Sequence, residues 1–150
     1  MIDVSTIYTI CDQRAEQERQ RADDLINEFA RCSQWLQAAL DHNIETTHSL
    51  NDICKGIFEG RYQFWPEDDA AMVTEIIEFP KARHLHGFLA GGNLETIQAT
   101  IPKIEEFAKA SGCTAATIMG RPGWTKALKD MGYGKGLVMT AKVFNTLDGQ

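Results

Sequence analysis

The chain has 150 residues, of which 43% are apolar and 24% are charged, and its formal net charge at pH 7 is −6. This composition predicts one domain with a real core, and the acidic balance argues against direct, sequence-specific nucleic-acid binding, which needs a basic patch. There is no run of 18 apolar residues and no basic n-region at the start, so we expect neither a membrane-spanning helix nor a secretory signal.

The charge is divided unevenly along the chain. Residues 1–69 hold 6 basic and 14 acidic side chains, whereas residues 70–150 hold 9 and 7. This division has two interpretations: an ordinary solvated surface, or a mildly basic face in the second half that meets a phosphate or an acidic partner. The four cysteines form no C-x-x-C pair, which argues against zinc and disulfides and is typical of a reducing cytoplasm.

Residues 5–42 are predicted to be mainly helical. An apolar stripe at helical spacing marks the second half, which should pack on the domain: Leu25, Phe29, Cys32, Leu36 and Leu40. Residues 12–24 are too polar to lie on a core, yet Ile7 and Ile10 precede them. We therefore expect residues 1–46 to form a projecting arm whose tip contacts a partner; the alternative is a frayed N-terminus.

The middle of the chain predicts a short helix and an antiparallel meander. Ser49 or Thr47 can cap a helix through Phe58. Three segments then alternate with turn residues, and we expect strands at residues 61–65, 70–79 and 83–90. The second of these is apolar on both faces, which is typical of a central, doubly covered strand.

The last third predicts strand, helix, strand, helix and strand. Residues 84–90 are the first strand, and apolar residues at three- and four-residue steps predict a helix from Leu94 to Ala108. Residues 114–119 and 137–144 are the later strands, with a short helix between them. A crossover helix of this length joins parallel strands. The fold class is therefore α/β (α+β), with a mixed sheet in residues 47–150 and a helical arm before it.

This order of elements resembles the GNAT (general N-acetyltransferase-related) superfamily over about residues 48–144. The meander FWPEDDAAMVTEIIEFPKARHLHGFLAGG, the helix ending in SGC and the segment GRPGWTKALKDMGY carry the resemblance. In the pattern of these residues, the sequence is similar to a group of GNAT-like proteins encoded by tailed phages and prophages. The resemblance implies a virion-associated protein, found in the virion or the host cytoplasm.

Family members that use acetyl-CoA hold its pyrophosphate on a glycine-rich loop before the central helix, because backbone N–H groups cradle the anion. The resemblance places Gly91, Gly92 and Asn93 there, with Arg121 as the nearest cation candidate. The loop is short and lacks the usual Arg or Gln. The alternative is a tight strand-to-helix turn with Asn93 as the N-cap.

The resemblance also implies two catalytic positions. Where many active members carry a proton-donating tyrosine, this chain has Leu128, which cannot donate a proton. Glu75 is the candidate general base, because it lies between apolar neighbours on the central strand; the alternative is a surface carboxylate. His84 and His86 point the same way on one strand, but no third metal ligand is near, and we expect no metal.

The segment 120–124, GRPGW, is the most distinctive turn in the chain. Arg121 and Trp124 are candidate partner contacts with Ile7 and Ile10; alternatively, Trp124 is a core residue. The sequence thus predicts a non-enzymatic assembly protein, without a cofactor, that binds other phage structural proteins or itself. The alternatives are an acetyl-CoA-dependent N-acyltransferase and, third, a regulator that binds a host protein.

Overall fold

A four-stranded mixed sheet forms the centre of the molecule. The computed structural model describes residues 3–120 and 123–144. The strands are β1 (Tyr62–Pro66), β2 (Ala70–Phe79), β3 (Ala82–Gly92) and β4 (Ala115–Ile118), and their order in the sheet is β1-β2-β3-β4. The first two pairings are antiparallel and the β3–β4 pairing is parallel. The predicted meander and parallel crossover are confirmed.

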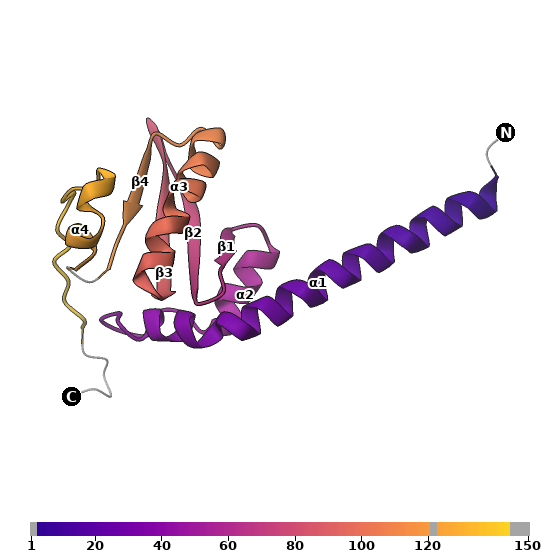
Figure 1. Cartoon of the computed structure of the whole chain (residues 1–150), viewed down its shortest axis with the longest axis horizontal. Coiled ribbons are helices and arrows are strands. Elements are labelled where there is room, and N and C mark those ends of the chain that lie inside the picture. Colours follow the sequence, from indigo (N-terminus) through magenta and orange to yellow (C-terminus); the bar gives the residue numbers. More distant parts are fainter. Residues whose placement is uncertain (1–2, 121–122, 145–150) are drawn as a thin grey trace.

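Helices cover both faces of this sheet (Figure 1). On one face, α3 (Leu94–Ala110) packs its apolar stripe against Ala70 and Met72 of β2. On the other face, α1 (Val4–Leu40) and α2 (Leu50–Phe58) pack against Ala71 and Val73. Since β2 lies inside the sheet and contributes to both core clusters, it is the doubly covered strand that its sequence predicts.

Helix α2 begins after Ser49, one of the two predicted N-cap candidates, and a capping box forms there. The Ser49 hydroxyl accepts a hydrogen bond from the Asp52 N–H, and the Asp52 carboxylate accepts one from the Ser49 N–H. Two N–H groups that would lack a partner at the helix start are therefore satisfied.

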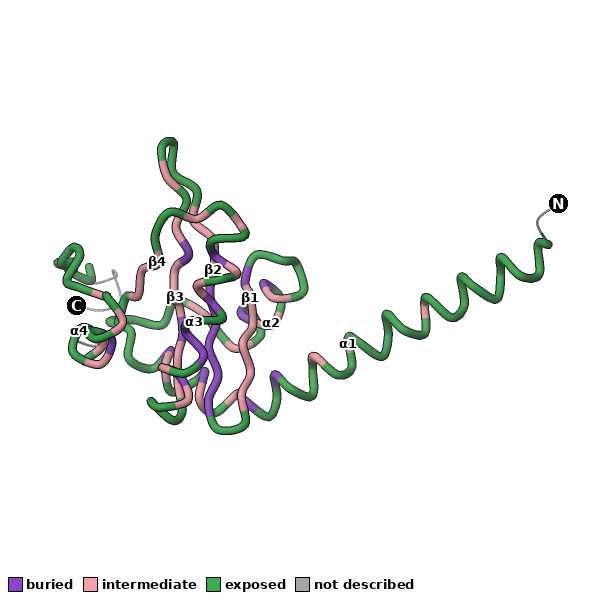
Figure 2. Tube along the Cα trace, turned by 45° about the horizontal axis from the view of Figure 1, so that its top comes forward, coloured by how far each residue is buried: buried purple, intermediate pink, exposed green. Residues whose placement is uncertain are grey.

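Helix α1 divides into a packed half and a free half (Figures 1 and 2). Its last three turns bury Phe29, Cys32, Leu36 and Leu40 in the first core cluster. The preceding residues, 4–28, are almost all exposed, and the helix runs straight out from the domain. The predicted packing of the second half is confirmed, and residues 4–28 are hereafter called the arm.

The predicted last strand is wrong. Residues 134–144 form no helix or strand and are exposed throughout. Before this segment, α4 (Gly123–Ala127) and the short 3-10 helix η1 (Lys129–Met131) bring Leu128 into the second core cluster. An apolar pattern of this kind becomes a strand only where another strand offers backbone partners, and residues 137–144 pair with no strand among the residues that the structure describes.

Candidate functional site

A row of polar side chains crosses all four strands of the sheet. In the strand register Tyr62 lies opposite Glu75, Glu75 lies opposite His86, and His86 lies opposite Thr117. Residues directly opposite each other share a face of the sheet. This face is the one that α1 and α2 partly cover, since Tyr62 belongs to their core cluster. His86 Nδ1 lies 3.0 Å from the Thr117 hydroxyl oxygen.

The environment of this polar row favours uncharged forms of two of its members. Burial lowers the pKa of His86, and the charge of Glu75 opposes this effect. Burial raises the pKa of Tyr62, and Glu75 raises it further. A neutral imidazole beside a carboxylate can accept a proton, so the row has the composition of an acid–base site.

His48 extends the polar row at the β1 edge. Its Nε2 lies 3.5 Å from the Tyr62 hydroxyl, and its ring centroid lies 4.9 Å from that of Phe88. Phe88 is an extra residue in β3, because Val73 pairs with Leu89 and Thr74 pairs with Gly87. Such a β-bulge redirects a side chain, and here it places Phe88 against the first core cluster.

The sequence suggests Glu75 as a candidate but not the residues that lie beside it. The sequence singles out His86 only as part of a histidine pair, and it gives no sign of Tyr62 or Thr117 as its neighbours. The missing information is the register between strands, which is set by turns and by the bulge at Val73/Thr74.

Replacing His86 with glutamine should reduce the acid sensitivity of the fold. Because burial lowers the pKa of His86 below its usual 6.5, the unfolded chain takes up this proton first as the pH falls. The contribution of neutral His86 to the free energy of unfolding is therefore full above about pH 6.5. It is lost as the pH falls through the pKa of His86 in the folded state. Urea unfolding at pH 8 and pH 5 measures the effect.

The matched control for this change is His42→Gln, in the exposed loop after α1. An equal loss of stability on acidification in wild type and His86→Gln would contradict a lowered pKa of His86 in the folded state.

The glycine turn before α3 is filled by contacts within the chain. A Cβ at Gly91 would lie 2.9 Å from the carbonyl carbon of Trp35 and closer still to its oxygen. The Asn93 N–H donates to the Asp69 carbonyl, and the Asn93 side chain accepts from the Glu95 N–H. Gly92 has a φ of +101°, next to the backbone of Asp69 and Ala70. The packing of α1 therefore accounts for Gly91, the positive φ beside the β2 backbone for Gly92, and the capping of α3 for Asn93.

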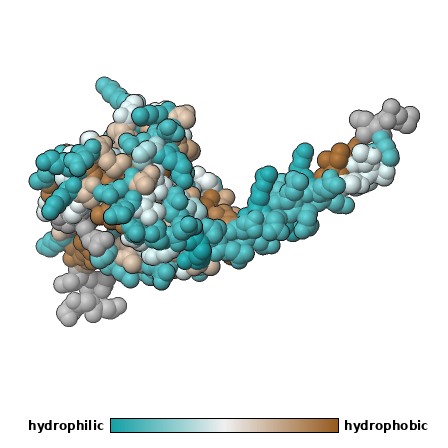
Figure 3. Space-filling view, viewed as in Figure 1, coloured by the Kyte–Doolittle hydropathy of each residue, from teal (hydrophilic) through white to brown (hydrophobic). Residues whose placement is uncertain are grey.

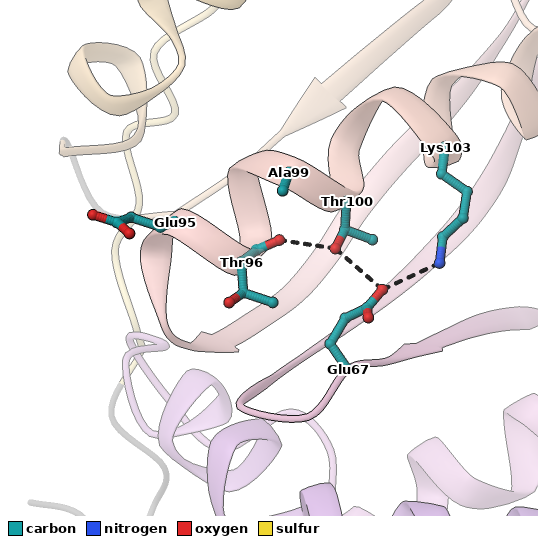
Figure 4. A pocket seen from close by; sticks show the side chains of 6 residues that line it. All are labelled: Glu67, Glu95, Thr96, Ala99, Thr100 and Lys103. Carbon is teal, nitrogen blue, oxygen red and sulfur yellow. Dashed lines mark hydrogen bonds and ion pairs between the residues drawn. The ribbon is translucent and has the colours of Figure 1, made fainter.

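A shallow hollow of about 430 Å³ lies between α3 and the turn that follows β1. Figure 4 shows the Thr100 and Lys103 side chains reaching from α3 to Glu67, whereas Glu95 points away from it. The Glu67 carboxylate accepts hydrogen bonds from the Thr100 hydroxyl at 3.2 Å and the Lys103 ammonium at 3.1 Å. Thr100 also bonds the Thr96 carbonyl. Since every charged group at the centre of the hollow has a partner, we interpret it as a clamp between α3 and the turn.

The predicted partner-contact residues lie far apart. Ile7 and Ile10 are exposed near the free end of α1. Trp124 is half-buried on the second core cluster, with its ring against Gly120. Arg121 lies outside the described residues. Leu128, which the resemblance aligns with a proton-donating tyrosine, is 1% exposed and is a core residue.

Within residues 3–120 and 123–144, no group of three or more His, Cys, Asp or Glu side chains is placed to hold a metal ion. In the same residues, no helix is both long and apolar enough to cross a membrane.

Comparison with known proteins identifies the fold at a coarse level. No protein-family model matches the sequence, and no curated protein does either. Among solved structures, TTHA1254 from Thermus thermophilus is similar in its wild-type form and in a point mutant, with TM-scores of 0.53 and 0.54. Each is 16% identical, and the similarity covers 74% of this chain and 92% of that protein. At this identity the likeness extends to the α+β fold and its mixed sheet.

Proposed function

We propose that this chain is a non-enzymatic assembly protein, in which the arm of α1 pairs with the arm of a second copy and a GNAT-like domain serves as the scaffold. The observation that carries the proposal is the apolar tip of the arm. Val4 and Tyr8 are 61% and 67% exposed, and Ile7 and Ile10 lie beside them. In Figure 3 this apolar end is separated from the domain by a polar stretch of helix. The resemblance of the sequence to tailed-phage proteins suggests that the protein is located in a virion.

One face of the arm repeats every seven residues and leads into the buried stripe. We call it the repeat face, and its members follow alternating steps of four and three: Val4, Tyr8, Cys11, Ala15, Glu18, Ala22, Leu25 and Phe29. Within the polar stretch, Ala15 and Ala22 are the half-buried positions, and Leu25 and Phe29 continue the series toward the core. A seven-residue spacing of this kind is the pattern by which two helices pack along a seam.

The order of large and small residues favours an antiparallel pair. Large side chains lie at both ends of the repeat face and small ones in the middle. In one antiparallel alignment Tyr8 is level with Leu25 of the second copy, and Cys11 is level with Ala22. Glu18 is then level with Ala15. A parallel pair would instead place Glu18 of one copy against Glu18 of the second copy. Two like charges in an apolar seam repel each other.

A charge placed on the repeat face should separate the arms. The full chain carrying Val4→Asp and Tyr8→Asp loses two apolar contacts per copy, each worth about 1.5 kcal/mol, so the dissociation constant should rise at least about a hundredfold. The matched control carries Gln13→Asp and Gln17→Asp, which add the same charge on the opposite face. Sedimentation of the two variants measures the difference; equal association of both would contradict the proposal.

A disulfide reports the alignment directly. In the antiparallel pair Cys11 faces position 22 of the second copy, so Ala22→Cys should give an intermolecular disulfide between those two positions on mild oxidation. Gln20→Cys, off the repeat face, is the control. Mass-spectrometric mapping of a Cys11-to-Cys11 link instead would show a parallel pair, and failure of Ala22→Cys to cross-link would count against arm pairing.

A second function is favoured by the polar row on the sheet. β4 ends at Ile118, opposite Gly87, so the rest of β3 continues without a β4 partner, and Glu75 and His86 lie together near that point. An N-acyltransferase needs a base to deprotonate an amine. Binding of millimolar acetyl-CoA, seen as a rise of several degrees in melting temperature, would favour this function over assembly alone.

A further inference from the structure

The outer edge of β4 has no partner strand among the described residues. β4 pairs with β3 on one side and stands last in the strand order. The N–H and C=O groups that point away from β3 are therefore free to bond another strand. Side chains show the same gap: Ala115 is exposed, and Ile118 is only half-buried although it belongs to the second core cluster. The core is therefore incompletely covered along this edge.

A strand-like segment of the same chain lacks a partner too. Residues 137–144 read LVMTAKVF: every odd position is apolar, whereas the even positions include Thr140 and Lys142, as in a strand with one covered face. Leu137 is 101% exposed and Phe144 is 79% exposed, and Val138, Met139 and Val143 are also exposed. A run of exposed apolar residues of this length marks an interaction surface.

We propose that residues 137–144 add to the free edge of β4 in a second copy of this chain, as a fifth strand. The segment offers backbone hydrogen bonds and apolar side chains, and the β4 edge lacks both. The exchange is reciprocal around a two-fold axis, so each copy gives one strand and receives one. Strand addition of this kind gains affinity from main-chain hydrogen bonds and specificity from alternate side chains.

The path of the chain favours a second copy over the segment's own β4. Tyr133 is anchored at the second core cluster, and only residues 134–136, Gly-Lys-Gly, separate it from Leu137. Neither Gly134 nor Gly136 has a neighbour within 4 Å of a built Cβ, so this linker is not fixed by packing. In Figure 1 the chain beyond α4 runs down beside the sheet, and residues 134–144 form no strand there although the linker is short.

Proline substitution at two successive positions tests the exchange. Along a strand, neighbouring N–H groups point to opposite sides, so only one of Met139 and Thr140 donates to β4. Proline at that position removes a hydrogen bond between the two strands. Proline at the other position is tolerated, because an edge strand has N–H groups that bond no neighbouring strand. The test uses the full chain with Val4→Asp and Tyr8→Asp, in which the arms are separated. We expect one proline variant to weaken the remaining dimer at least about a hundredfold, since the bond is lost twice per dimer, and the other to leave it intact.

The outcomes separate this proposal from arm pairing. A chain with separated arms that sediments as a monomer overturns the strand exchange and leaves arm pairing untouched. A dimer that both prolines leave intact overturns it as well. Hydrogen exchange gives a second readout: protection of amides 137–144 should appear only at concentrations where the dimer forms. Protection that persists in the monomer would place the strand on its own β4 and would also overturn the exchange.

Discussion

The variant Gly91→Ala should lose about 3 kcal/mol of folding free energy. The added Cβ would meet the carbonyl oxygen of Trp35, and its distance to the carbonyl carbon would be 2.9 Å. Both atoms belong to the backbone of α1 and cannot rotate away as a flexible side chain would. Relief requires α1 to move off the sheet, which opens the first core cluster around Leu36 and Leu89. Urea unfolding of the full chain measures the loss.

Gly123→Ala is the matched control for this change. Gly123 begins α4 and has no atom within 4 Å of a built Cβ, so alanine there should change the stability by less than about 1 kcal/mol. The comparison also decides why Gly91 is a glycine. If the residue served ligand approach alone, alanine would leave the fold intact and reduce only binding. A Gly91→Ala chain as stable as wild type would therefore contradict the packing account.

Two different two-fold contacts on one chain have a consequence for assembly. A single isologous contact closes a dimer, whereas two contacts with separate axes link each copy to two others. Arm pairing and strand exchange together would thus give a ring or an open filament, depending on the angle between the axes. An assembly protein in a particle uses this kind of repetition. Loss of one contact leaves dimers and loss of both leaves monomers, so the two interfaces can be counted independently.

The elements that the sequence predicts well are those whose signals are local. The apolar stripe of α1, the N-cap candidate Ser49 and the two-faced apolar pattern of β2 each lie within one continuous segment of the chain, and the structure confirms all three. Helix period, side-chain caps and strand alternation are properties of neighbours in the chain. The order of strands in the meander follows from the short connections between them.

The predictions that failed or stayed incomplete depend on distant contacts. Residues 137–144 have a local pattern for a strand, but pairing also requires the edge of another strand, and the pattern does not say which edge that is. Gly91 is explained by the backbone of Trp35, which lies 56 positions earlier in the chain and meets it only after folding. The polar row of Glu75 and His86 depends on a register that includes a bulge. In each case the missing information was which segments meet.

The variant Leu36→Ala tests where the arm ends. Leu36 is 0% exposed and is one of the largest fully buried side chains, so its truncation should cost about 3 kcal/mol through lost transfer energy and a cavity. Ile7→Ala, in the free half of the same helix, should cost less than about 0.5 kcal/mol in the separated chain. A boundary after residue 46 would assign both residues to the arm, whereas the core cluster assigns Leu36 to the domain.

The two variants respond differently because one helix serves two purposes. The packed half of α1 is part of the core, and its rigidity fixes the direction in which the arm leaves the domain. A helix rises about 1.5 Å per residue, so the arm holds its tip about 35 Å away. Leu36→Ala should therefore lower both the unfolding midpoint and the strength of arm pairing, whereas Ile7→Ala should lower at most the second. A Leu36→Ala chain with an unchanged midpoint would place the whole helix outside the domain and remove the support on which the arm depends.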